Sequence, residues 1–142
     1  MGNSNKGITP PKGVISIKDG IKLNDEWTKT RKAAMDRCIQ HESGGKIKED
    51  NRSSWWSLED LEDYILYARR LAKEEKFEVT GFRVYCGAHS KSCYSTSFIV
   101  PTGKSLCPEK NIADDDGDGD LPIGPLNDGV EGDPPGIGYT GG

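Results

Sequence analysis

The chain has 142 residues and a mass of 15.5 kDa; 33% of its residues are hydrophobic, 30% are charged, 18 are glycine and 8 are proline. This length supports one domain, and this composition lies between that of a small globular domain and that of a partly disordered chain. Its apolar runs are all far shorter than the roughly 20 residues of a membrane-spanning helix. Because residues 1–6 also lack the apolar stretch of a secretory signal, we expect a cytoplasmic protein without a membrane span.

Charge is divided unevenly along the chain, although the net charge is only -4 at pH 7. Residues 106–142 carry nine acidic residues and a single lysine, a net charge of -8, which leaves +4 for residues 1–105. The same tail contains nine glycines and five prolines. Since few of its residues can be buried, the tail cannot offset the entropy lost on ordering by packing on itself. We expect it to be ordered only by contact with the body of the protein or with a partner.

The first third of the chain predicts an arm, a short strand and a helix. Residues 1–13 include two consecutive prolines and three glycines, which is typical of an irregular arm. The three β-branched residues within residues 14–17 predict a strand or an extended segment, and residues 19–20, Asp-Gly, predict a turn after it. The first helix is then expected over residues 24–42, with Asn24 as its N-cap.

A second helix is predicted from Ser57 to about residue 76. Ser57 followed by Asp60 resembles a capping box, and Trp56 lies where a hydrophobic staple would have its first residue. Acidic residues are concentrated early and basic residues late, as the helix dipole favours. The apolar residues that recur at helical spacing and predict one continuous face are Leu58, Leu61, Tyr64, Ile65, Ala68, Leu71 and Ala72.

Two strands are predicted after this helix. Residues 78–86 and 94–100 alternate between apolar and polar positions, and the polar loop between them suits an antiparallel hairpin. A lone hairpin is marginally stable, so the helices must cover it. The expected fold is therefore α+β, with two amphipathic helices packed on a small antiparallel sheet (hairpin 78–100). This compact domain spans residues 14–105, and the irregular acidic tail spans residues 106–142.

Three stretches of this domain carry a resemblance to known proteins. They are residues 55–65 (WWSLEDLEDYI), residues 81–88 (GFRVYCGA) and residues 95–102 (STSFIVPT). Together they resemble a group of small proteins from Bacteroidetes-type bacteria. The resemblance implies a cytoplasmic bacterial protein; it implies no particular activity and no catalytic residue. Cys86 stands where that pattern has an aromatic residue, so no shared metal site is implied either.

The spacing of cysteine and histidine residues suggests a metal site. The chain has two histidines, and each lies three residues after a cysteine. On a helix this spacing puts Cys38 and His41 on one side, while Cys86 ends a strand and His89 lies in the loop that follows. Thiolate and imidazole groups suit zinc, and four protein ligands make a structural site. These four residues are candidate zinc ligands; the alternative is that the cysteines are ordinary small apolar residues.

Two other uses of the cysteines stay open at this point. Cys93 and Cys107 are spare candidates for the metal site. Four cysteines also allow two disulfides, for example between Cys86 and Cys93 across the hairpin. In a reducing compartment free thiols are the default.

The acidic tail contains half of a calcium-binding pattern. Asp114, Asp116 and Asp118 followed by a glycine match the opening of an EF-hand loop, but Pro125 occupies the twelfth position, where a bidentate acid is needed. A high-affinity EF-hand is therefore excluded. Weak calcium binding by Asp114, Asp116, Asp118 and Asp120 is a second metal hypothesis, with a solvated acidic turn as its alternative.

The sequence contains none of the familiar catalytic motifs. It has no glycine-rich phosphate loop, no nucleophile elbow and no zincin helix, so we expect no enzymatic activity. Basic residues on both predicted helices lie beside acidic ones, which disfavours nucleic-acid binding. The leading hypothesis is a non-enzymatic protein that binds a protein partner or assembles with itself; its interaction residues are not specified by any motif. A zinc-stabilised module and weak calcium binding are the alternatives.

Overall fold

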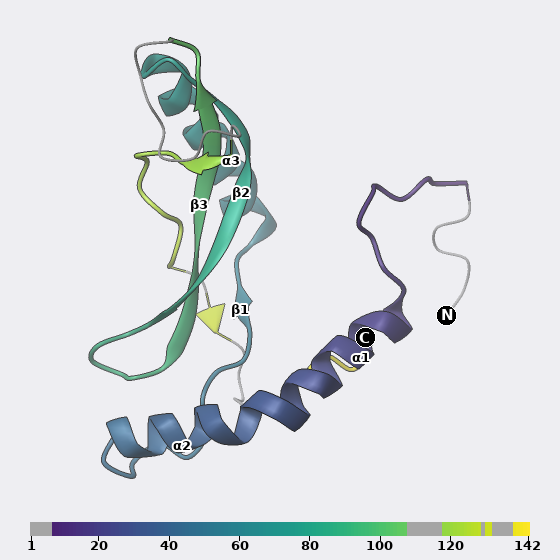
Figure 1. Ribbon diagram of the computed structural model, residues 1–142, viewed down its shortest axis with the longest axis vertical. Helices are drawn as coiled ribbons and strands as arrows, with labels where there is room; N and C mark the ends of the chain where they lie inside the picture. Colours follow the sequence, from purple (N-terminus) through teal and green to yellow (C-terminus); the bar gives the residue numbers. More distant parts are fainter. Residues whose placement is uncertain (1–6, 108–117, 129, 132–137) are drawn as a thin grey trace.

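The computed structural model describes residues 7–107, 118–128, 130–131 and 138–142. Its fold is α+β, as the sequence predicts: one long helix, a second helix and a three-stranded antiparallel sheet. Figure 1 shows the second helix lying along the sheet, with the long helix crossing below them and projecting to one side. In chain order the elements are α1 (Ile17–Trp27), η1 (Thr28–Lys32), α2 (Ala33–Glu42), β1 (Ser54–Trp55), α3 (Leu58–Glu74), β2 (Phe77–Ala88), β3 (Ser95–Ser105), β4 (Gly119–Asp120) and β5 (Val130–Glu131).

The long helix consists of α1, η1 and α2 and begins earlier than its sequence predicts. Its N-cap is Ser16, whose hydroxyl accepts a hydrogen bond from the Asp19 N–H at 3.0 Å. The predicted turn at residues 19–20 and the cap at Asn24 are therefore wrong. Of the strand or extended segment predicted over residues 14–17, no strand forms, and Ile17 already belongs to the helix. A serine three residues before an aspartate is a helix-start signal in its own right, and it outweighs the β preference of a few branched residues.

A π-helical turn, η1, lies in the middle of this helix. Two threonine hydroxyls back-bond to the preceding turn: that of Thr28 donates to the Asn24 carbonyl at 3.0 Å and that of Thr30 to the Glu26 carbonyl at 2.6 Å. Such bonds perturb regular helical geometry. Single π turns of this kind often occur at functional sites.

The second helix, α3, begins as predicted. The Ser57 hydroxyl accepts a hydrogen bond from the Asp60 N–H at 2.9 Å. Tyr64, Ala68 and Ala72 are the buried residues of α3. Leu58 and Ile65, which the sequence assigned to the same apolar face, are exposed. The buried face of α3 therefore combines one large residue, Tyr64, with two alanines, and it is narrower than the apolar face that the sequence predicts.

The sheet has the strand order β2-β3-β4, with every pair antiparallel. The predicted hairpin is confirmed, and its two strands are longer than their apolar alternation indicates. A bulge between Val79 and Gly81 shifts the register. Close backbone approach explains the glycine at position 103: a side chain there would meet the Glu78 carbonyl oxygen at 2.2 Å.

Residues 118–128 of the acidic tail lie along the β3 side of the hairpin and form one edge of the sheet. The Leu121 N–H donates to the Pro101 carbonyl at 2.9 Å, and Ile99 bridges to Leu126 further along. Leu121 and Ile123 are only 4% and 8% exposed, and they form a core cluster with a buried alanine of α3. This part of the tail is therefore ordered by burial against the body of the same chain.

In the part of the chain that the structure describes, none of the helices combines the length and the apolar character that crossing a bilayer requires.

Candidate functional site

A cavity of about 730 Å³ opens between α2 and the tip of the β2–β3 hairpin. Trp27 and Ile39 line it from the long helix, the segment between α2 and β1 contributes polar residues, and the strands contribute several hydroxyl groups. Three of the four cysteines also line it: Cys38, Cys86 and Cys93. The cavity gathers most of the thiols of the chain in one place, although they come from segments far apart in the sequence.

The predicted zinc ligands only partly converge. Cys38, Cys86 and His89 line the cavity, whereas His41 is not among its lining residues. The His41 side chain is 87% exposed, and its Nδ1 lies 3.0 Å from a Glu42 carboxylate oxygen. Within the described residues, no three cysteine, histidine or acidic side chains are grouped closely enough to hold a metal ion. Zinc binding by these four residues stays a prediction.

All four cysteines carry free thiols. Cys93 has the most constrained backbone of the four, because its φ of 70° lies in the left-handed region, which residues other than glycine rarely adopt. Its N–H closes the hairpin loop by donating to the His89 carbonyl at 2.9 Å, and its thiol lies 3.6 Å from the Glu42 carbonyl at the end of α2. Cys93 therefore links the hairpin tip to the long helix through a thiol.

One wall of the cavity is held by the buried carboxylate of Asp50. This side chain accepts hydrogen bonds from the Ser95 N–H at 2.8 Å and from the Ser95 hydroxyl. The Asp50 N–H in turn donates to a carboxylate oxygen of Asp36 on α2, at 2.9 Å. Asp50 thus connects the start of β3 to the long helix. No sequence pattern predicts this role, because an aspartate in a polar loop ordinarily faces solvent.

Asp36 is stabilised in its charged form. Burial tends to raise the pKa of its carboxyl, but hydrogen bonds from Lys32 and from the Asp50 N–H outweigh burial and lower that pKa. Lys32 Nζ lies 2.5 Å from the carboxylate, one helical turn away. The charged carboxylate is the form that accepts the bond from Asp50, so this ion pair supports the connection between α2 and the sheet.

Arg52 also lines the cavity and contacts the long helix. Its guanidinium lies 4.5 Å from the centre of the Trp27 ring, a cation–π geometry. It also donates to the Asn24 side-chain oxygen and to the Thr28 hydroxyl, both at 2.8 Å. Arg52 therefore clamps the loop onto the long helix where α1 meets the π turn, a role that sequence spacing does not reveal.

The predicted calcium ligands lie at another place. Asp114 and Asp116 are outside the described residues. Asp118 directly precedes β4 and Asp120 belongs to it. Their carboxylates already have protein partners: Asp118 accepts from the Thr80 hydroxyl at 3.1 Å, while Asp120 accepts from Arg83 at 2.5 Å and from the Tyr85 hydroxyl. Calcium binding by these four aspartates stays a prediction.

Asp120 also perturbs two partly exposed groups on β2. The hydrogen bond to Asp120 raises the pKa of Arg83, and it raises the pKa of the Tyr85 phenol as well. Both bonds tie β4 to the outer face of β2. Their arrangement explains how an acidic segment lies on a sheet that offers arginine and hydroxyl donors.

Comparisons of the chain with protein-family models, with curated proteins and with solved structures found no match.

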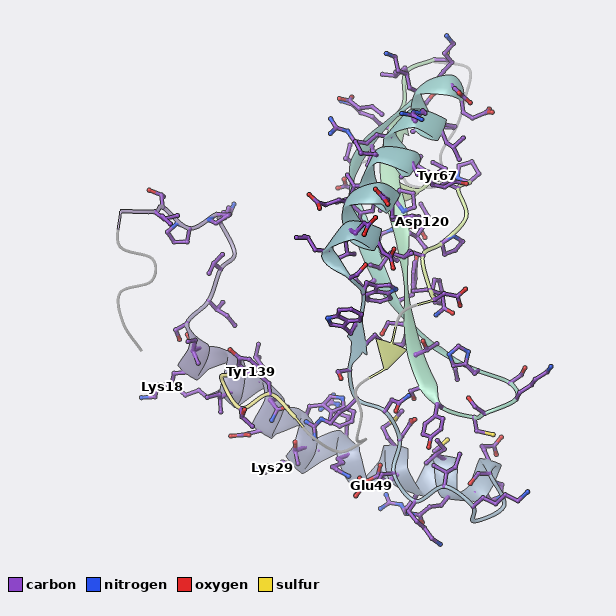
Figure 2. The ribbon with its side chains drawn as sticks, turned by 180° about the vertical axis from the view of Figure 1, so that it is seen from behind. Lys18, Lys29, Glu49, Tyr67, Asp120 and Tyr139 are labelled. Carbon is purple, nitrogen blue, oxygen red and sulfur yellow. The ribbon has the colours of Figure 1, made fainter. Side chains whose placement is uncertain are left out.

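Exposed apolar residues also lie at the projecting end of the long helix. Every residue of α1 is partly or fully exposed. Leu23 is 66% exposed, and Val14 and Ile15, which lead into the helix, are 60% and 54% exposed. We call Val14, Ile15 and Leu23 the apolar arm surface. Residues 138–142 lie along another side of α1, where Figure 2 labels Tyr139 beside the helix.

Proposed function

We propose that this protein is a non-enzymatic component of a protein assembly and that α1 is its binding element. One observation carries the proposal: α1 extends away from the sheet (Figure 1), and the apolar arm surface, which lies on α1 and directly before it, is exposed. Full burial of an aliphatic side chain stabilises an interface by roughly 1.5–3 kcal/mol. The three residues of the apolar arm surface could therefore supply a substantial part of a binding free energy.

The rest of the molecule supports a role for α1 as a rigid arm. Helix α1 continues without interruption through η1 into α2, and Arg52 and Asp50 fix that helix to the sheet. An arm that is held at its base loses little conformational entropy when its tip binds. The cytoplasm is the compartment that we propose, since free thiols persist in a reducing environment.

The test compares two substitutions on neighbouring positions of α1. Leu23→Glu places a charge on the apolar arm surface, and Lys22→Glu places the same charge on an exposed polar position. Sedimentation over a wide concentration range measures self-association, and quantitative pull-down from the source cells measures capture of other proteins. We expect association that Leu23→Glu abolishes and Lys22→Glu retains. A wild-type chain that stays monomeric and captures no protein in a Leu23-dependent way would contradict the proposal.

A second candidate function is the zinc-stabilised module, and one observation favours it: Cys38, Cys86 and His89 line the same cavity. Zinc would have to draw α2 and the hairpin tip together, since its bonds to sulfur and nitrogen are only about 2.0–2.3 Å long. Elemental analysis of the purified protein, followed by melting with and without a chelator, tests this function. Stoichiometric zinc and a lower melting temperature in chelator would support it, and metal-free protein with an unchanged melt would eliminate it.

A further inference from the structure

Strand β2 forms the edge of the sheet opposite to the acidic tail. In the strand order β2-β3-β4, β3 pairs with β2 on one side and with the tail on the other (Figure 1). Within the described part of the chain, no strand pairs with the outer side of β2. An edge strand carries a row of backbone N–H and C=O groups that can receive a further strand. Because β2 is 12 residues long, it presents an extended row of such groups.

The hydrogen bonds of β3 show which residues of β2 face outward. Alternate residues of β3 direct backbone groups away from β2 and toward other parts of the chain; they are Ser95, Ser97, Ile99 and Pro101. Ile99, for example, exchanges both of its hydrogen bonds with Leu126 at 2.9 Å. In an antiparallel pair, the residue directly opposite such a residue also points its backbone groups away from the pair. The register therefore assigns the outward-facing row of β2 to Ala88, Cys86, Val84 and Phe82.

This outward-facing row lacks the features that keep edge strands from pairing. Those features include lysine, proline and β-bulges. Residues 81–88 contain neither lysine nor proline, and the bulge of β2 lies at their start, between Val79 and Gly81. The side chains of the row are open to water, since Val84 is 64% exposed and Phe82 is 37% exposed. Among the residues that the structure describes, none bonds to the outward N–H and C=O groups of the row.

We propose that the outer edge of β2 pairs antiparallel with the same edge of a second copy of this chain, about a two-fold axis at Val84. The observation that points to a second copy is the complementarity of residues 81–87 about their centre. From the ends inward, glycine stands opposite glycine, phenylalanine opposite cysteine and arginine opposite tyrosine. A two-fold interface requires this property, because each residue meets the residue that lies equally far from the axis in the second copy.

Pairing about Val84 satisfies both faces of the strand. Val84 meets its own counterpart and Phe82 meets Cys86, in pairs that exchange both backbone hydrogen bonds. On the other face Arg83 meets Tyr85, which sets a guanidinium beside an aromatic ring. An axis at Arg83 would instead set two arginines opposite each other, and like charges in that position destabilise a sheet. The residue types therefore favour the axis at Val84.

This inference goes beyond the proposed function, because pairing through β2 uses no residue of α1. It joins the sheets of two copies into one continuous sheet and leaves the apolar arm surface unused. Leu23→Glu should therefore remove association through α1 and leave the β2-paired dimer intact.

The first experiment places charges at the axis in full-length chains. Val84→Lys sets two lysines opposite each other and Val84→Glu sets two glutamates opposite each other. Each variant alone should have a dimer dissociation constant about tenfold or more above that of the wild type. Mixing the two variants pairs lysine with glutamate and should restore a heterodimer. Sedimentation equilibrium measures the dimer, and circular dichroism checks that each variant folds like the wild type.

Two substitutions serve as controls for the charged variants. Val84→Thr keeps a β-branched side chain without a charge and should dimerise like the wild type. Leu66→Lys places the same charge on an apolar residue of α3 that is 60% exposed and that the pairing does not use. It should also dimerise like the wild type.

Amide hydrogen exchange gives a second measurement that needs no substitution. The N–H groups of Phe82, Val84 and Cys86 are free in a single chain and bonded in the dimer. Their exchange should therefore slow about tenfold or more as the protein concentration rises through the dissociation constant. The N–H groups of Arg83 and Tyr85 point toward β3, so they should be protected at every concentration and provide the internal control.

Three results would overturn the inference, and each leaves the proposed function to its own test. A chain that is monomeric at every concentration would refute pairing through β2, and capture of proteins that depends on Leu23 would still support α1 as the binding element. Outward amides that exchange freely in a dimeric sample would show that another surface forms the dimer. Charged variants that dimerise as tightly as the wild type would refute the axis at Val84.

Discussion

The two halves of this molecule are stabilised in different ways. In the half formed by α3 and the sheet, small residues of one helix pack on the strands, and Leu121 and Ile123 complete a core. In the half formed by the long helix, only Ile39 is buried, and polar contacts through Asp50 and Arg52 attach the helix to the rest. The difference indicates that the first half supplies the stability of the chain and the second half presents a surface.

The largest effect is expected from removing a core side chain in the first half. Leu121→Ala should lower the free energy of unfolding by about 2–5 kcal/mol, because it removes buried methyl groups and leaves a cavity. Urea denaturation followed by circular dichroism measures the loss. Leu66→Ala, at an exposed position of α3, is the matched control and should change stability by less than about 0.5 kcal/mol. Equal effects of the two substitutions would show that residues 118–128 do not share the core.

The next effect is expected where the halves meet. Asp50→Ala leaves the N–H and hydroxyl of Ser95 without their acceptor, which should cost about 1–3 kcal/mol. Hydrogen exchange should also become faster in α2, because the helix loses its link to β3. Glu49→Ala removes the neighbouring exposed carboxylate and is the control. If Asp50→Ala leaves both stability and exchange unchanged, the halves are joined by other contacts.

A smaller effect is expected at the buried phenol of α3. The Tyr64 hydroxyl donates to the carbonyls of Gly124 at 2.9 Å and Ile99 at 3.2 Å, so Tyr64→Phe should cost about 1 kcal/mol. Burial raises the pKa of this phenol above its ordinary value of 10.0. The neutral form is thus favoured in the folded state, so its contribution is complete below pH 10 and declines as the pH rises toward the folded pKa.

Unfolding measured across the alkaline range checks this dependence. The wild type should lose more stability above pH 10 than Tyr64→Phe does. Tyr67 lies on the same helix and is half exposed, so the stability of Tyr67→Phe should change with pH as that of the wild type does. Identical alkaline profiles for the wild type and Tyr64→Phe would contradict the assignment.

The smallest effect is expected from the ion pair on the long helix. Hydrogen bonds from Lys32 and the Asp50 N–H lower the pKa of Asp36 below its ordinary value of 3.8, despite the opposing effect of burial. The charged form therefore stabilises the fold above pH 3.8, and this contribution disappears as the pH falls through the folded pKa. Asp36→Asn should cost at most about 1 kcal/mol at neutral pH and nothing in strong acid. Asp63→Asn, an exposed control on α3, should be neutral, and a constant cost of Asp36→Asn at every pH would contradict the pKa direction.

Local signals in the sequence predicted the half that contains α3 well. The cap at Ser57, the helix after it and the two strands of the hairpin are each signalled by a few neighbouring residues, and the structure confirms these elements. Leu58 and Ile65 of the predicted apolar face are nevertheless exposed. The same kind of reasoning failed at the start of the long helix, where Asp19-Gly20 suggested a turn. Gly20 belongs instead to α1, where the ring of Tyr139, more than a hundred residues away in the chain, lies against it.

The candidate site depends on contacts that no local pattern encodes. The spacing of cysteine and histidine residues predicted a site of four residues, and Cys38, Cys86 and His89 do line one cavity. His41, the fourth, does not line it, whereas Asp50, which no spacing pattern indicated, does. Distances between segments are fixed by how the helix, loop and hairpin pack, and spacing along the chain carries no information about that packing.

Periodicity, caps and composition act locally, and these local signals were enough to predict the α+β class, the second helix and the hairpin. Tertiary structure alone decided that residues 118–128 form a sheet edge, that the thiols share a cavity and that a glycine inside α1 receives a distant tyrosine. These features follow from long-range packing, in which a side chain acquires its role only from the neighbours that folding brings to it.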